Sequence, residues 1–205
     1  ALGDRAGHFR TGSSGEGTDT DDLSLPGAQP ELATAILALG KPTIVVLQNG
    51  RAFALGEVAE QADAILCTWF AGEVGTAAIA DAVVGAVNPC GKTPVTFPRT
   101  SGQQPRTYNA KRLDAGIPRA RDYAPQFPFG HGLSYTNFAI ETVSVDSAEI
   151  ATDGAVVVRA RVRNTGAVEG DTVVQVYARD LVAQNPRPVA ELKGFQRVRL
   201  ASGEA

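Results

Sequence analysis

The sequence predicts two folds in succession: an α/β region whose mostly parallel sheet is sandwiched by helices, and then an antiparallel β-sandwich. Two patterns support this prediction. In the first half, wholly apolar segments rich in β-branched residues alternate with segments of helical periodicity, at the spacing of βαβ units. In the last third, apolar and polar residues alternate one by one, which is typical of half-buried strands. The sandwich has too few strands to close, so we expect it to be truncated.

The first expected element is a helix within residues 26–39, and both of its ends are marked. Pro30 suits the first helical turn, which tolerates a residue without an amide proton. Apolar residues follow at helical spacing from Leu32 to Leu39, and Gly40 then closes the helix.

Strands and helices alternate over the next fifty residues. The segment 43–47 is wholly apolar and β-branched, as expected for a strand of a parallel sheet that is covered on both faces. We then expect a short helix at 54–62, a second buried strand at 64–70, a helix at 73–85 and a third strand at 93–97.

The pattern changes after residue 97. Residues 98–137 are rich in Pro, Gly, Arg and Tyr without sustained periodicity, which indicates a long ordered loop system. Strands are expected at 155–164, 171–180 and 191–200; in the first of them valines share one face and arginines the other. These patterns place an α/β domain at 1–115, a linker at 116–137 and the β-sandwich at 138–205.

Composition excludes several classes of function. The 19 basic and 22 acidic residues are mixed without a basic stripe, so nucleic acid is not an expected partner. The apolar runs are too short to cross a membrane, and no signal segment opens the chain. Cys67 and Cys90 lack the neighbours of a metal site, so we expect buried, inert thiols, no metal and no cofactor. The chain begins at Ala1 and contains no methionine, from which we expect that a segment lies upstream of Ala1 or was removed.

Three motifs resemble known sites without matching them. Residues 85–93 have five residues between the glycines of a would-be phosphate loop, which requires four. Residues 19–22 lack the glycine and distal glutamate of an EF-hand, which leaves only a nonstandard calcium site open. Residues 12–16 miss the spacing of a nucleophile elbow by one residue.

Glu16 lies between two glycines on a loop without apolar periodicity. One interpretation is an ordinary solvated glutamate. The other is a general acid, because flanking glycines permit the unusual backbone conformations of functional loops. The acidic residues Asp19, Asp21 and Asp22 would raise the pKa of Glu16 if they lie close enough.

The order of several motifs resembles the C-terminal part of family 3 glycoside hydrolases, of the bacterial β-glucosidase and β-xylosidase type. The resemblance runs through nearly all 205 residues. It is carried by GSSGEGTDTDDLSLPGAQPEL at 12–32, GKPTIVVLQNGRAFAL at 40–55, the segment 62–99, FPFGHGLSYTNF at 127–138, VRNTGAVEGDTVVQVYARD at 162–180 and RPVAELKGFQRVRL at 187–200.

The resemblance implies a division of labour between domains. In that family a (β/α)8 barrel carries an aspartate nucleophile, the following α/β sandwich domain contributes the acid/base glutamate, and a fibronectin type III-like domain comes last. The family's Gly-Glu-Gly falls on residues 15–17, so the resemblance implies that Glu16 is the catalytic acid/base. It further suggests that His8, Phe9 or Arg10 lines a substrate-binding rim.

Other residues of the matching motifs are expected to support the scaffold. Asn49 or Arg51 would support the acid loop or contact sugar, since both follow a strand at the carboxyl edge of the sheet. Trp69 and Phe70 are expected in the core, and His131 is expected to fix the interdomain linker.

The implied function is therefore part of a retaining, exo-acting β-glycosidase that takes oligosaccharides or aryl β-glycosides and releases glucose or xylose. The barrel and the first strand of the sandwich domain are missing, so we expect this chain to be inactive unless the same or another chain supplies the barrel. The alternative is a noncatalytic carbohydrate-binding or assembly module that has lost its barrel. The sequence leaves the compartment open, with a periplasmic or secreted location favoured over a cytoplasmic one.

Overall fold

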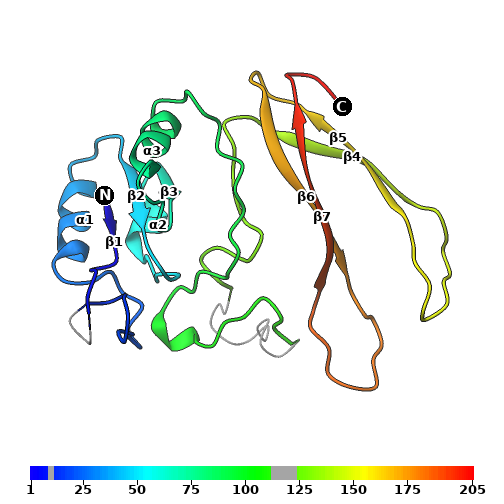
Figure 1. The fold of residues 1–205 in the computed structure, drawn as a ribbon, viewed down its shortest axis with the longest axis horizontal. Helices are drawn as coiled ribbons and strands as arrows, with labels where there is room; N and C mark the ends of the chain where they lie inside the picture. The colour runs from blue at the N-terminus through cyan, green and yellow to red at the C-terminus, as the bar shows by residue number, and fades with distance from the viewer. Residues whose placement is uncertain (9–11, 112–123) are drawn as a thin grey trace. The chain divides into compact units, whose positions relative to one another are not determined.

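The computed structural model describes residues 1–8, 12–111 and 124–205, and Figure 1 shows its strands and helices in chain order. The chain divides into two compact units. The first comprises Ala1–Ala80, Thr93–His131 and Tyr177–Glu191, and the second comprises Asp81–Lys92, Gly132–Val176 and Leu192–Ala205.

The first unit contains a three-stranded parallel sheet in the order β1-β2-β3. Its strands are β1 (Leu2–Gly3), β2 (Ile44–Gln48) and β3 (Ala64–Cys67). The strands predicted at 43–47 and 64–70 are thereby confirmed, although β3 ends three residues earlier than expected. Strand β1 was not predicted, because two residues are too few to display a strand period.

The three predicted helices are present. They are α1 (Gln29–Leu37), α2 (Glu57–Gln61) and α3 (Gly75–Val83). Proline lies in the first turn of α1, and Gly40 follows that helix with a φ of 62°. This left-handed conformation is the one that favours glycine after a helix end, so the predicted stop signal acts as expected.

Both α1 and α2 contribute to the apolar core beside β2. Ala33 of α1 and Val58 of α2 belong to one buried cluster with Val45 and Leu47, which alternate along one face of β2. On the other face, Ile44 is 50% exposed. Val46, on the same face, is half-buried, so the second face of this strand is covered only in part.

The third strand predicted at 93–97 does not join the parallel sheet. Phe97 instead makes an isolated antiparallel bridge with Phe127, and the amide of Thr93 donates to the carbonyl of His131 at 2.7 Å. Pro94 lies within this segment and Pro98 directly follows it, and proline cannot donate to a ladder. The pairing with 126–131 ties the end of the long loop to the α/β unit.

Four strands follow the loop: β4 (Phe138–Val145), β5 (Val158–Asn164), β6 (Gly170–Ala178) and β7 (Glu191–Leu200). The pair β4–β5 is antiparallel, and β6 and β7 form a second two-stranded sheet. The predicted strands at 155–164, 171–180 and 191–200 are confirmed, whereas β4 was not predicted.

An open apolar cavity of about 550 Å³ lies in the second unit. Its apolar lining comes from β5, β6 and β7, with Val158, Ala160, Val162, Val174, Val176, Phe195, Val198 and Leu200. Phe195 is 72% exposed, so the interior of this sandwich is only partly covered. In the part of the chain that the structure describes, no helix has the length and apolar character needed to cross a membrane.

Candidate functional site

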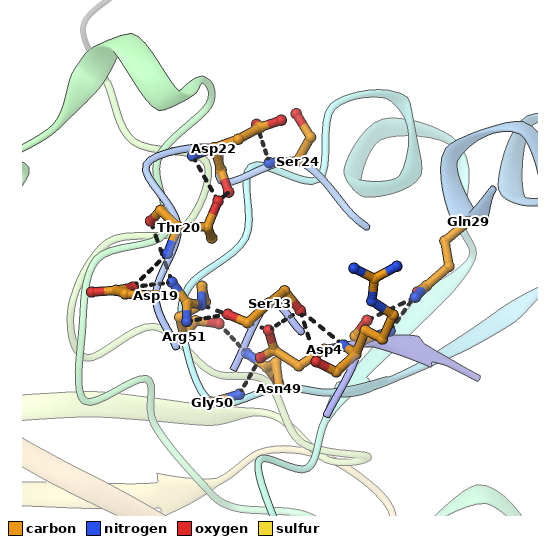
Figure 2. A network of polar contacts seen from close by, with 12 residues as sticks. Asp4, Ser13, Asp19, Thr20, Asp22, Ser24, Gln29, Asn49, Gly50 and Arg51 are labelled. Atoms are coloured by element: carbon orange, nitrogen blue, oxygen red, sulfur yellow. Dashed lines mark hydrogen bonds and ion pairs between the residues drawn. The ribbon is translucent and has the colours of Figure 1, made fainter. Parts of the chain in front are cut away.

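The loop that carries Glu16 lies at the carboxyl ends of β1 and β2 (Figure 2). Backbone hydrogen bonds hold its first stem against the segment that follows β1: the amide of Ser13 donates to the carbonyl of Arg5 at 2.8 Å, and the amide of Gly7 donates to the carbonyl of Ser14 at 3.0 Å. Because carboxyl ends of parallel strands gather at one edge of a sheet, this is where sites of α/β folds form.

Glu16 is exposed at the tip of a tight turn. The amide of Thr18 donates to the carbonyl of Gly15 at 3.1 Å and closes this turn. Gly15 and Gly17 have φ values of 143° and 63°, so both flanking glycines occupy conformations that other residues avoid. A Cβ on Gly15 would lie 2.0 Å from the carbonyl oxygen of Gly7. The Gly-Glu-Gly pattern is therefore required by the backbone path of the loop.

Arg51, just after β2, contacts the loop on both sides of Glu16 (Figure 2). Its Nη2 donates to the carbonyl oxygen of Ser13, and its Nη1 lies 2.6 Å from Oδ1 of Asp19. Its Nε faces Oδ1 of Asp4 at 3.6 Å. Arg51 thus supports the loop that carries Glu16.

Asp4 forms the buried base of the same network, with a side chain only 1% exposed. One carboxylate oxygen accepts a hydrogen bond from the amide of Gly50 at 2.7 Å, and the other accepts one from the hydroxyl of Ser13 at 2.8 Å. The hydroxyl of Ser13 in turn accepts from the amide of Arg5 at 2.8 Å. Asp4 and Ser13 were not predicted as site residues, because only folding brings them beside Arg51.

Gln29, at the start of α1, fixes the short strand β1 in place. Its carboxamide oxygen accepts from the amide of Gly3 at 2.7 Å, and its carboxamide nitrogen donates to the carbonyl of Gly3 at 2.8 Å. The side chain thereby imitates a neighbouring strand. Since Asp4 follows directly, this contact also positions the base of the loop network.

Asn49 is fully buried beneath Arg51. Its amide nitrogen donates to the carbonyl of Arg51 at 2.5 Å, and its oxygen accepts from the thiol of Cys67 at 3.3 Å. Burial raises the pKa of the Cys67 thiol, which keeps it protonated and suited to donate this hydrogen bond. Asn49 therefore supports Arg51 from the core side.

The acidic residues after Glu16 have partners of their own. The hydrogen bond from Arg51, aided by the amide of Thr20, lowers the pKa of Asp19. The amide of Ser24 donates to Asp22 at 2.9 Å and lowers the pKa of that carboxyl in the same way. Among the described residues, Glu16 and Asp21 have neither a hydrogen bond nor an ion pair through their side chains.

The other predicted site residues have different outcomes. His8 is described and exposed, whereas Phe9 and Arg10 lie outside the described residues, so the rim subsite stays a prediction. Trp69 packs against the core as expected, but Phe70 is 67% exposed, so its assignment to the core was wrong. Trp69 has a φ of 52°, which ends the extended path of β3 and turns Phe70 away from the core side.

No group of three or more His, Cys, Asp or Glu side chains within residues 1–8, 12–111 and 124–205 is arranged to hold a metal ion. The described chemistry at this edge is that of exposed carboxylates, Glu16 among them, on a loop that an arginine contacts on both sides of Glu16. Such a carboxylate can donate a proton to a bound molecule or accept one from it.

Comparison with protein families decides the assignment. The model of the glycosyl hydrolase family 3 C-terminal domain matches residues 3–135. The chain belongs to glycoside hydrolase family 3. A fibronectin type III-like domain matches residues 172–205, the region of the paired strands β6 and β7.

Similar family 3 proteins include both β-glucosidases and β-xylosidases. The periplasmic β-glucosidase of Salmonella typhimurium is 44% identical over 204 residues, which are 94% of this chain and 27% of that protein. A β-xylosidase of Formosa agariphila is 47% identical over 195 residues, which are 93% of this chain and 27% of that protein. The chain thus spans about a quarter of the length of these family 3 relatives.

Solved structures extend the likeness to the fold. A β-glucosidase from Erythrobacter marinus superimposes with a TM-score of 0.85 at 45% identity, covering 91% of this chain and 25% of that one. The β-glucosidase from Listeria innocua in complex with glucose gives a TM-score of 0.83 at 35% identity, covering 94% of this chain and 28% of that one. The predicted succession of an α/β region and antiparallel sheets is therefore shown for this family 3 chain.

Proposed function

We propose that this chain supplies Glu16 as the general acid/base of a retaining, exo-acting β-glycosidase. Its substrates are terminal non-reducing β-D-glycosyl residues of oligosaccharides or aryl β-glycosides, and its activity is that of a β-glucosidase or β-xylosidase. The single observation that carries this proposal is the exposed carboxylate of Glu16 between two glycines of positive φ, on a loop that Arg51 fixes on both sides.

The reaction requires a second carboxylate from a (β/α)8 barrel, in the same or another chain. An aspartate of the barrel attacks the anomeric carbon while Glu16 protonates the departing glycosidic oxygen. Glu16 then removes a proton from the water that hydrolyses the glycosyl-enzyme. A retaining pair of this kind stands about 5–5.5 Å apart. This chain by itself lacks the nucleophile of that mechanism, so we expect no turnover from it alone.

Two further parts of the proposal concern location and domain boundaries. A periplasmic or secreted location is supported by the similar protein named periplasmic β-glucosidase. The boundaries at 115 and 137 stay predictions, and limited proteolysis tests them: cuts between 116 and 137 that leave two stable fragments would support them, and cuts elsewhere would contradict them.

The test of function requires the assembled enzyme, by which we mean this chain joined to the (β/α)8 barrel of a family 3 relative. We expect the assembled enzyme to hydrolyse an aryl β-glucoside or β-xyloside and Glu16→Gln to reduce kcat/KM about 10²–10⁴-fold on a substrate whose leaving group needs a proton. Glu31→Gln is the matched control, because Glu31 is an exposed glutamate of α1 in the same unit. Sugar binding without turnover would instead support a noncatalytic module.

A further inference from the structure

Arg51 contacts the two stems of the Glu16 turn, at positions equally far from Glu16 in the sequence. Its guanidinium binds Ser13, three residues before Glu16, and Asp19, three residues after it. A third contact, from Nη1 to the carbonyl oxygen of Thr20 at 3.4 Å, extends the attachment along the second stem. A single side chain therefore limits how far both ends of the turn can move.

The geometry depends on the planar fork of an arginine. The two terminal nitrogens of the guanidinium contact different stems, while Nε faces the buried carboxylate of Asp4. A lysine presents its protons from a single nitrogen and cannot span such divergent acceptors in one plane. We call Asp4, Ser13, Asp19 and Arg51 the Arg51 clamp.

One nitrogen of the Arg51 clamp makes no hydrogen bond. Among the side chains that the structure describes, Nε of Arg51 is the only buried nitrogen or oxygen atom without a hydrogen-bond partner, although Asp4 lies 3.6 Å away. The Arg51 side chain is mostly buried, at 18% exposed. Buried polar atoms without a hydrogen bond occur where other contacts of the same side chain fix its position. Here those contacts are the ones with Ser13 and Asp19.

The base of the clamp is rigid. Gly50 supplies an amide to Asp4, and a Cβ on Gly50 would lie 3.0 Å from the hydroxyl of Ser14, on the first stem. Asn49, fully buried, holds the carbonyl of Arg51. The loop is therefore connected through Arg51 to residues fixed by the sheet.

We propose that Arg51 is a positioning residue that sets the reach of the Glu16 carboxylate toward the glycosidic oxygen. The inference rests on the proposed function of Glu16. Proton donation requires the carboxyl group within hydrogen-bond distance of the leaving oxygen, and misplacement by about 1 Å can cost about 10²-fold in rate. Arg51 acts through the loop and does not itself transfer a proton.

Leaving groups of different basicity separate this role from a merely structural one. Departure of 2,4-dinitrophenolate needs no proton, whereas departure of phenolate or a sugar alcohol does. In the assembled enzyme, we expect Arg51→Met to reduce kcat/KM for phenyl β-glucoside about 10–100-fold and to leave kcat/KM for the 2,4-dinitrophenyl glucoside within about twofold. Arg51→Lys should restore only part of the loss, because the fork is missing.

Two further variants distinguish a positioning role of Arg51 from a general loss of stability. Arg51→Met leaves Asp4 buried without a cation, so Asp19→Asn serves as a second variant: the Asp19 side chain is 89% exposed and its change spares the core. We expect Asp19→Asn to show the same leaving-group dependence at smaller size. Arg161→Met is the matched control, since Arg161 also pairs with a carboxylate, that of Glu141 at 3.1 Å, and lies in the second unit.

The outcomes separate the two proposals. If Glu16→Gln lowers kcat/KM equally for both glucosides, or not at all, the proposed function fails. If Glu16→Gln shows the leaving-group dependence but the Arg51 and Asp19 variants lower both substrates by one common factor, or neither, the positioning role is overturned while the function stands. If Glu16→Gln, Arg51→Met and Asp19→Asn all lower kcat/KM for phenyl β-glucoside more than for the 2,4-dinitrophenyl glucoside, and Arg161→Met changes neither, the positioning role of Arg51 is supported.

Discussion

Asn164, the last residue of β5, is a fully buried polar residue, and both polar atoms of its side chain make hydrogen bonds. Its oxygen accepts from the hydroxyl of Thr136 at 2.6 Å and the amide of Gly166 at 3.0 Å, and its nitrogen donates to the carbonyls of Val168 at 2.8 Å and Leu200 at 3.1 Å. Asn164→Ala leaves these partners unpaired, so we expect the free energy of unfolding to fall by about 2–4 kcal/mol.

Urea unfolding measures this change, with Asn137→Ala as control. Asn137 is exposed and should change the free energy of unfolding by less than about 0.5 kcal/mol. Equal effects of the two substitutions would contradict the structural role assigned to Asn164.

Asp171 joins two arginines of β7 across the second sheet. Nε of Arg199 donates to one of its oxygens at 2.6 Å and Nε of Arg197 to the other at 2.5 Å. The hydrogen bond from Arg199, followed by that from Arg197, holds the pKa of Asp171 below its ordinary range. The arginines are 61% and 68% exposed, so solvent screening keeps the contribution of this contact to stability small.

The lowered pKa gives this contact a defined pH dependence. Its stabilisation is fully present above the ordinary pKa of an aspartate and is lost as the pH falls through the lowered pKa of Asp171. Asp171→Asn should therefore unfold at lower urea concentration than the parent at neutral pH, and the difference should shrink in acid. A difference that stays constant down to the lowest accessible pH would contradict this cause.

The sequence predicts part of the site and misses the rest for a physical reason. The glycines at 15 and 17 signal a special backbone conformation around Glu16, and their positive φ values bear this out. The contact between Arg51 and Ser13 joins residues 38 positions apart, and that between Asp4 and Gly50 spans 46. Single buried charged residues carry no period, so their pairing becomes visible only in the fold.

Among the elements, β1 depends on a glycine. Gly3 has a φ of 152°, and a Cβ there would lie 1.8 Å from the carbonyl oxygen of Gln48 in β2. We expect Gly3→Ala to separate β1 from β2 and to lower the free energy of unfolding by about 1–3 kcal/mol. Because Asp4 follows Gly3, the substitution should also increase amide hydrogen exchange at Ser13 and Thr18.

Gly91→Ala is the control for this prediction. Nothing lies within 4 Å of a Cβ at Gly91, so its effect on unfolding should stay below about 0.5 kcal/mol. Unchanged exchange at Ser13 and Thr18 in Gly3→Ala would contradict the link between β1 and the loop.

Elements with strong periodicity were predictable and those with interruptions were not. The β-branched run of β2 and the helical spacing of α1 gave the right element type at nearly the right bounds. The segment 93–97 also contains apolar residues, but Pro94 within it cannot donate to a ladder, and only an isolated bridge forms at Phe97. In β4 the register shifts between Ile140 and Thr142, and this irregularity breaks the alternation on which strand prediction depends.

At the scale of the whole molecule, the second unit exposes a large apolar surface. Ile140 and Val143 of β4 are 59% and 64% exposed, and Phe195 of β7 is 72% exposed beside the open cavity. Exposed apolar patches promote association. We expect the isolated chain to bind a hydrophobic dye and to sediment as more than a monomer at high concentration, and Phe195→Gln to reduce both.

Glu149→Gln provides the comparison for this surface, because Glu149 is an exposed polar residue of the same unit. It should leave dye binding and sedimentation unchanged. A monomeric chain without dye binding would contradict the assignment of an uncovered apolar surface.

The central claim is that Glu16 transfers the proton in both steps of glycoside hydrolysis. Azide tests it most directly, because a variant without the acid/base still forms the glycosyl-enzyme from 2,4-dinitrophenyl β-glucoside but hydrolyses it slowly. Azide needs no general base and attacks that intermediate. For Glu16→Ala in the assembled enzyme, we predict a rise in turnover with azide concentration and β-glucosyl azide as product. Turnover that is independent of azide, with glucose as the only product, would contradict the account.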